Sequence, residues 1–301
     1  ISLYVGSGSP LSNVGTLTNQ GIELEVGYKL SVDKVNLSFL ANASYVKNEI
    51  KNLGNQTGYI DKESLPTLGT VSRNQNGYPI GYFFGYKAIG VFQTQEEIDN
   101  YISPATGKPI QPNAVPGDTK FEDLNGDGVI SDDNEDRTMI GKPNPDWMAG
   151  LTVAADWNGF DLSAFFQGSF GADVFDALRR YELAAVNYTS DALERWTGPG
   201  TSNSMPRIVL GDTPKNFRPS TLLVHDASFL RLRNLQVGYT LPAQLTRKAY
   251  IQRLRFYASF DNLLTITGYK GMDPEIGSTM GIDKGVYPQA RVYTFGLNLT
   301  F

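Results

Sequence analysis

The stretch "WMAGLTVAADWNGFDLSAFFQGSF", residues 147–170, alternates apolar and polar side chains on both sides of an Asn-Gly pair. Alternation with a period of two is the pattern of β-strands, because successive side chains point to opposite faces of a sheet. Residues 158 and 159 form only a short connection between the two alternating runs. The stretch therefore predicts two strands joined by a tight turn.

The same alternation recurs elsewhere in the chain, at residues 21–30, 35–45, 235–241, 254–260 and 293–301. With 16 Tyr, 16 Phe and 31 Gly among 301 residues, the composition also favours an all-β protein. Counting back from the last strand gives seven strands, and Ile1 to Val5 would be the remainder of an eighth. The fold class expected is an antiparallel β-structure of about seven to eight strands.

Two architectures produce strands of this kind. A soluble sandwich turns its apolar faces inward, whereas a transmembrane β-barrel turns them toward lipid and its polar faces toward a wet lumen. Trp147 and Trp157 end one apolar face, which matches an aromatic girdle at each membrane interface. Glu25 and Arg255 lie on polar faces, and a dry core would not accept such charges unpaired. These features favour the barrel.

The connections between the strands alternate between short and long, as in outer-membrane barrels with short periplasmic turns and long outer loops. The short ones are residues 31–34, 158–159 and 242–250. We therefore expect some side chains to face lipid (Val26, Phe39, Val153, Phe256 and Leu297) and others to face the lumen (Glu25, Asn42, Arg255 and Asn298).

The composition excludes several other classes of function. A net charge of −5 argues against nucleic acid, which requires basic surfaces. With no Cys and only His225, the chain lacks the ligands and bases of zinc hydrolases and triads. Asp161 and Asp261 could be nominated as a glycosidase pair, but no spacing pairs them, so no enzyme is expected. The sequence contains no run of 18 apolar residues, so it predicts no transmembrane helix.

One long connection contains an acidic loop, "FEDLNGDGVISDDNEDRT" at residues 121–138. Asp123, Asn125 and Asp127 stand at alternate positions before Gly128, and Val129 can offer its backbone carbonyl. This is the opening of an EF-hand loop, and oxygen ligands alone favour Ca²⁺ over zinc or copper. The departure from an EF-hand is at its twelfth position, where Asn134 replaces the bidentate Glu.

Two helical segments are expected in the connections. Thr94 and Glu97 form a capping box that predicts a short helix over residues 94–101. Residues 176–196, "DALRRYELAAVNYTSDALERW", read as a longer helical stretch ended by Gly198 and Pro199.

Several motifs in combination resemble the C-terminal part of SusC/RagA-type TonB-dependent outer-membrane transporters. They are "NQGIELEVGY" (19–28), "PIGYFFGYKAIGVFQTQEEI" (79–98), "PGDTKFEDLNGDGVISDDNEDRTMIGKPNPDW" (116–147), "GFDLSAFFQGSFGADVFD" (159–176), "FLRLRNLQVGYTLP" (229–242) and "LRFYASFDNLLTIT" (254–267). The resemblance implies the last strands of a 22-stranded barrel, with residues 1–301 as its C-terminal part and 51–142 as a long extracellular loop.

The resemblance also implies a function, namely energy-coupled import of glycans, oligosaccharides or peptides. A SusD-like surface lipoprotein would cap the barrel, and the TonB–ExbB–ExbD complex would act through a plug and TonB box that this sequence lacks. The alternative is a soluble, calcium-stapled β-rich binding or adhesion module. Within the calcium loop 123–136, the resemblance makes Asp136 the last ligand, with Asp132 and Asp133 as alternatives. A metal-free Asx-rich turn is the competing interpretation of this loop.

Overall fold

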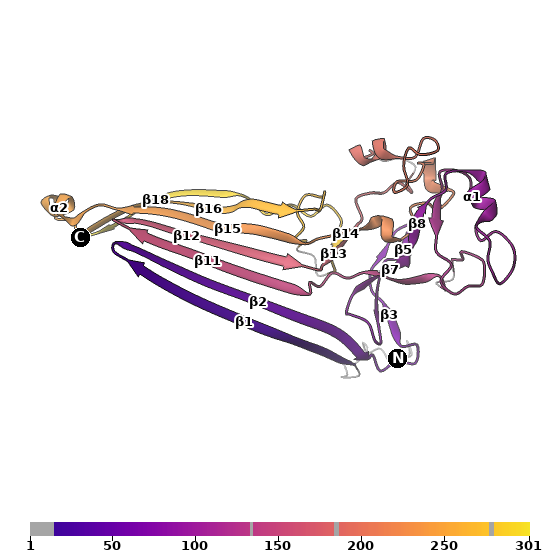
Figure 1. The fold of residues 1–301 in the computed structure, drawn as a ribbon, viewed down its shortest axis with the longest axis horizontal. Helices are drawn as coiled ribbons and strands as arrows, with labels where there is room; N and C mark the ends of the chain where they lie inside the picture. Colours follow the sequence, from indigo (N-terminus) through magenta and orange to yellow (C-terminus); the bar gives the residue numbers. More distant parts are fainter. Residues whose placement is uncertain (1–14, 133–134, 184–186, 277–279) are drawn as a thin grey trace, which may run out of the picture.

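A computed structural model describes residues 15–132, 135–183, 187–276 and 280–301. Seven long antiparallel strands form one sheet in the order β1-β2-β11-β12-β15-β16-β18 (Figure 1). Their bounds are β1 Thr16–Val32, β2 Val35–Asn52, β11 Trp147–Trp157, β12 Phe160–Phe170, β15 Phe229–Thr240, β16 Arg253–Thr267 and β18 Val292–Thr300. The seven predicted strands are confirmed, and the predicted stub Ile1 to Val5 lies outside the described residues.

The register of the sheet sorts the side chains into two continuous faces. Phe39 lies opposite Val153, and Phe256 lies opposite Leu297, so the apolar residues of neighbouring strands share one face. On the other face Glu25 lies opposite Asn42, just as Arg255 lies opposite Asn298. The predicted division into an apolar and a polar face is therefore confirmed.

Aromatic side chains gather at both ends of the apolar face. At one end the Tyr45 and Trp147 rings lie 5.0 Å apart, and Trp147 is paired in register with Phe170. At the other end Phe160 lies 6.2 Å from Trp157 and 4.4 Å from Tyr239, measured between ring centroids. Rings in these two bands have the placement of interfacial girdles, where an aromatic body is apolar and its polar tip is wet.

All the long connections leave the same end of the sheet (Figure 1). At the opposite end, Asn158 and Gly159 close β11 and β12 with φ angles of 48° and 86°. Such left-handed pairs fit two-residue hairpins because their twist matches that of the strands. At the end with the long loops, residues 53–146, 171–228 and 268–291 intervene between strands. The short turns and the long loops thus lie on opposite sides, as the sequence predicted.

The long connections fold into small sheets of their own. One has the order β10-β7-β6-β3 (Arg137–Gly141, Tyr82–Tyr86, Ser72–Gln75 and Tyr59–Asp61), and another β14-β13-β17 (Val224–Asp226, Asp173–Asp176 and Ile282–Asp283). There are also two separate two-stranded sheets, β4-β5 (Ser64–Leu65 and Gly69–Thr70) and β8-β9 (Ala88–Val91 and Thr119–Phe121). The helical turns are α1 Gln95–Asn100, α2 Ala243–Thr246, η2 Ser190–Glu194, η3 Leu210–Asp212, η4 Thr221–Leu223 and η5 Arg247–Ala249.

The buried apolar core lies mainly in these loops and not on the long sheet. Val71, Phe83 and Phe175 are completely buried and pack in one cluster with Leu223 and Ile282. By contrast, Val26, Phe256 and Leu297 on the apolar face of the sheet remain about half exposed. Apolar side chains that stay this exposed on one face of a sheet fit a barrel segment whose apolar face meets lipid.

One helix prediction is confirmed and the other is wrong. Helix α1 begins after Thr94, whose hydroxyl accepts a hydrogen bond from the Glu97 amide. Within the predicted helix 176–196, however, the described residues hold only the end of β13 and the short turn η2. The Ala177 amide donates to the Asp283 carbonyl, so sheet pairing takes a group that a helix would need. Across the described part of the chain, no helix has the length and apolarity to span a bilayer.

Candidate functional site

The polar face of the sheet carries a β-bulge that concentrates charge at one point. The β12–β15 register shifts between Phe165 and Phe166, which are paired with Asn234 and Leu232, so Arg233 is the extra residue of β15. The β15–β16 register shifts at the same place, where Asn262 on β16 has a left-handed φ of 53°. Leu232 and Leu235 are paired with apolar residues of the neighbouring strands, which leaves Arg233 and Asn234 between them. A bulge of this kind places two successive side chains against one on the partner strand. Both Arg233 and Asn234 thereby reach the polar face.

Two arginines of β15 hold the loop between β16 and β18. Arg231, only 1% exposed, contacts Asp273 at 2.5 Å and Glu275 at 3.2 Å. Arg233 contacts both carboxylate oxygens of Glu275, at 2.6 and 2.5 Å, and donates to the Gln167 side chain at 2.6 Å. Two arginines and two carboxylates therefore balance in charge and fix this loop against the polar face of the sheet.

Asp273 is the central acceptor of this cluster. Burial would raise its pKa, but the amides of Gln289 and Glu275 and the Arg231 guanidinium together keep that pKa below its ordinary value. Asp273 therefore stays ionised at neutral pH and attracts Arg231. Arg231 and Arg233 were not among the predicted site residues. Their signal in the sequence is two arginines at alternate positions, each following a leucine, in "LRLR".

The two carboxylates that were considered for a hydrolase are engaged in other contacts. Asp161 accepts hydrogen bonds from Arg255, at 2.9 Å from its Nε. Asp261 accepts from the Asn234 side-chain amide at 2.7 Å. Asp161 lies opposite Gly238, whereas Asp261 lies opposite Asn234 several rungs away, so the structure does not bring the two acids together. Both side chains serve as partners for polar groups on this face.

The acidic loop folds as a series of side-chain-capped turns. Asp123 accepts from the amides of Gly126 and Gly128 at 2.8 and 2.9 Å, and Asn125 accepts from the Asp127 amide at 2.9 Å. Asp127 in turn accepts from the Val129 amide at 2.8 Å. Positive φ angles of 77° and 88° at Gly126 and Gly128 permit these sharp bends. The three predicted ligands thus bend one tight loop.

Asp136 joins the same loop from the other end. Its side chain is fully buried and accepts from the amides of Leu124 and Ser131, both at 3.1 Å. Burial raises its pKa, and the nearby charges of Asp123 and Asp127 raise it further. Of the alternative ligands, Asp132 instead contacts Lys215 and Arg218. Asp133 and Asn134 lie outside the described residues.

Some features of this loop suit calcium, and others suit a metal-free turn. All the predicted metal ligands are oxygen atoms, and the buried carboxylate of Asp136 lies close to those of Asp123 and Asp127, which suits a hard cation. Against this, the Asn125 amide donates to Asp127 and Glu135 at 3.0 and 2.9 Å, as a metal-free turn would. In the ranges that the structure describes, no three His, Cys, Asp or Glu side chains form a metal-binding group. Calcium therefore stays a prediction.

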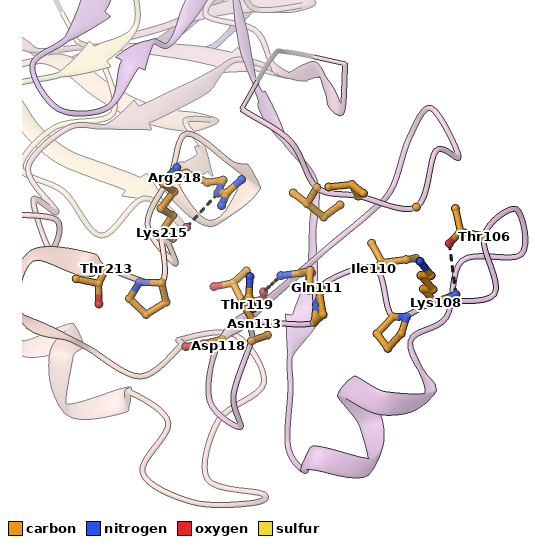
Figure 2. Close-up of a pocket in the computed structure, with 17 residues that line it drawn as sticks. Thr106, Lys108, Ile110, Gln111, Asn113, Asp118, Thr119, Thr213, Lys215 and Arg218 are labelled. Carbon is orange, nitrogen blue, oxygen red and sulfur yellow. Dashed lines mark hydrogen bonds between the residues drawn. The ribbon is translucent and has the colours of Figure 1, made fainter.

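A cavity of about 700 Å³ lies beside the acidic loop (Figure 2). Gly128, Val129 and Ile130 of that loop line one side of it. The remaining lining residues come from two other segments, residues 106–119 and 213–218. Lys215 and Arg218 lie together at one end of the cavity and Lys108 lies at the other.

Comparisons with known proteins agree with this architecture. The chain is 32% identical over 99% of its length to TonB-dependent receptor P3 of Formosa agariphila, and 30% identical over 96% to TonB-dependent receptor SusC of Bacteroides thetaiotaomicron. It covers 30% and 27% of those proteins, so it spans less than a third of their length. No family model matches the chain.

Solved structures give the same result. The RagAB peptide transporter matches with a TM-score of 0.75 and 26% identity, over all of this chain and 31% of the matched chain. The RagAB peptide importer in its open-open state matches with a TM-score of 0.73 and 27% identity, over 30% of the matched chain. With its sheet of seven long strands and its polar and apolar faces, the chain is a segment of an outer-membrane β-barrel of the SusC/RagA type, similar over nearly its full length to TonB-dependent receptors.

Proposed function

We propose that this chain is part of an outer-membrane importer that takes up oligomeric nutrients, either glycans and oligosaccharides or peptides. The observation that carries the proposal is the two-faced sheet of a chain related to SusC and to the RagAB importer. Its apolar face fits lipid, and its polar face fits the wall of a wet passage. Arg231 and Arg233, beside the β-bulge, hold the loop between β16 and β18 against that wall through Asp273 and Glu275.

A SusD-like surface lipoprotein is the partner that we propose for the outer end of this barrel, and the TonB–ExbB–ExbD complex is the proposed energy source. The support is the kinship to SusC and RagAB. The long connections provide a folded platform at the outer end, with its own buried core. The relatives are named as receptors and importers, so we assign no catalytic role to Asp161 or Asp261.

Growth of a deletion strain tests the import function. A strain lacking the whole receptor is expected to lose growth on one member of a panel of glycans and peptides, and to regain it when the receptor is restored. The soluble binding module predicts a different result, because such a protein would stay in solution without detergent. Unimpaired growth on every nutrient, with the receptor soluble in buffer alone, would favour that alternative.

We also propose that Ca²⁺ occupies the loop 123–136 as a structural staple. Asp123, Asn125 and Asp127 would provide side-chain oxygens, Val129 its carbonyl, and Asp136 the closing carboxylate. Extracellular sites of this kind bind at about 10⁻⁴–10⁻³ M, so calcium outside the cell would keep the site filled. Such a site fixes the shape of a loop and does not respond to small changes in concentration.

Asp127→Ala is expected to increase protease cleavage between Gly117 and Lys142 in the full-length receptor while the barrel stays assembled. The reason is that the substitution removes one proposed ligand and the acceptor for the Val129 amide. Limited proteolysis followed by mass spectrometry measures the effect. Asp99→Ala, in the exposed helix α1 of the same connection, is the matched control and should cleave like the wild type.

A chelator separates the calcium staple from a metal-free turn. If calcium holds the loop, EGTA should make the wild-type loop as sensitive to protease as Asp127→Ala. A metal-free turn predicts that EGTA changes nothing, even though Asp127→Ala still loosens the loop. The second pattern would remove calcium from the proposal.

A further inference from the structure

Three arginines and four aromatic rings alternate in a stack through the outer loops. Each arginine carbon Cζ lies between two rings, at the following distances from their centroids: Arg73 at 4.0 Å from Tyr59 and 3.5 Å from Phe84, Arg137 at 4.3 Å from Phe84 and 5.7 Å from Tyr86, and Arg218 at 4.8 Å from Tyr86 and 4.9 Å from Phe121. Stacking on ring faces restricts a guanidinium to one plane. Arg218 is the last arginine of this stack.

The polar groups of the first two arginines find partners inside the fold. Arg73 donates to the Asp61 carboxylate at 2.7 Å, and Arg137 donates to the carbonyls of Thr70 and Phe84. The Nε of Arg218 donates to the Lys215 carbonyl at 3.1 Å, and its buried Nη1 has no hydrogen-bond partner among the described residues. The nearest carboxylate contact of that nitrogen is Asp132, at 3.8 Å.

Arg218 also lines two neighbouring cavities, the one of about 700 Å³ described above and another of about 640 Å³. Lys215 lines both of them as well. The larger cavity has three cationic lining residues, Lys108, Lys215 and Arg218, in a chain whose net charge is −5. Its one acidic lining residue, Asp118, is already paired with Arg207 at 2.6 Å. Cations therefore outnumber carboxylates in the lining of the cavity, and two of these cations, Lys215 and Arg218, contact Asp132 outside that lining.

We propose that the larger cavity binds a carboxylate group of an acidic ligand, with Arg218 and Lys215 as the anion-binding residues. The two rings hold the Arg218 guanidinium in place beside the cavity, where it and Lys215 can both donate to a carboxylate. Ile110, Val129 and Pro214 line the same cavity and provide apolar contact for the rest of the ligand.

Asp132 is the internal competitor for these two cations. Its side chain is 66% exposed and that of Lys215 is 55% exposed, so water screens their ion pair. Exposed pairs of this kind contribute little to stability, and a ligand can replace one at small cost. The inference rests on the proposed import function, because it names the chemical class of the imported oligomer. Two sources share this chemistry, an oligosaccharide that contains uronic acid and an acidic peptide.

Calorimetric titration of the purified full-length receptor tests the proposal. The acidic probes are trigalacturonic acid and the peptide Gly-Glu-Glu-Gly, and the neutral ones are maltotriose and Gly-Gln-Gln-Gly. We expect one acidic probe to bind more tightly than its neutral counterpart, and Arg218→Gln to weaken that binding about tenfold or more. Whether the saccharide or the peptide binds identifies the source of the carboxylate.

Lys87→Gln is the matched control, because Lys87 is a half-exposed cation of another long connection that pairs with Glu122 outside the cavity. It changes the net charge as Arg218→Gln does and should leave the affinity unchanged. If near-ultraviolet circular dichroism shows that Arg218→Gln disturbs the aromatic stack, the affinity of the Lys215→Gln receptor for the acidic probe is the test instead, because the Lys215 side chain is exposed. Equal affinity for acidic and neutral probes, or full affinity in Lys215→Gln and in a folded Arg218→Gln, would overturn the carboxylate site.

The outcomes separate this site from the import function. A receptor that supports growth on a nutrient but shows no preference for the acidic probes overturns the carboxylate site alone. A receptor that binds an acidic probe through Arg218, while its deletion affects no growth condition, overturns the import function and leaves the site in place.

Discussion

Arg231→Met is expected to destabilise the attachment of the loop between β16 and β18 by about 3–5 kcal/mol. Arg231 is 1% exposed and contacts Asp273 and Glu275, so the substitution leaves Asp273 without its cation. Glu275 keeps Arg233 as a partner, which places most of the effect on Asp273. Hydrogen exchange of residues 268–276 in the full-length receptor measures the loss of protection.

A second substitution shows whether the unpaired charge is the cause. Removing both partners of a buried ion pair is often nearly neutral, whereas removing one is costly. Arg231→Met combined with Asp273→Leu should therefore restore much of the protection that Arg231→Met removes. The substitution Arg253→Met, on the neighbouring strand at an exposed position, serves as a control and should change little. If the double variant exchanges faster than Arg231→Met, the loop is held by contacts other than this pair.

Val153→Arg is expected to cost about 2–4 kcal/mol, whereas Thr152→Arg costs about 1 kcal/mol or less. Val153 lies opposite Phe39 and Ala164 on the apolar face near the middle of β11, where lipid surrounds the barrel. An arginine at that depth loses its hydration without gaining a partner. Thr152 lies on the polar face one residue away, where an arginine head can stay in water.

Reversible unfolding of the full-length receptor in lipid vesicles measures the difference between these two variants. They share the strand, the depth and the new charge, so only the face of the sheet separates them. Equal costs at the two positions would contradict the assignment of the apolar face to lipid. A larger cost at Thr152 would reverse the faces.

The sequence by itself determined the long strands, their two faces and the side on which the turns lie. These properties repeat along the backbone with a period of two, so each strand can be recognised from its own residues. The register between Phe39 and Val153 follows from the pattern, because a shift by one residue would put apolar side chains on the polar face. The capping of α1 by Thr94 was equally local, since donor and acceptor lie three residues apart.

Only the tertiary structure decided what depends on distant residues. Residues 176–196 were predicted to be helical, yet Ala177 donates to Asp283, more than a hundred positions along the chain, and the described residues of this stretch form only the end of β13 and the short turn η2. Arg231 meets Asp273 because a bulge turns one strand and a loop folds back onto it. Arg218 gains its place between Tyr86 and Phe121 from three separate segments. Pairings across such distances depend on how the whole chain closes its loops, which no local pattern in the sequence records.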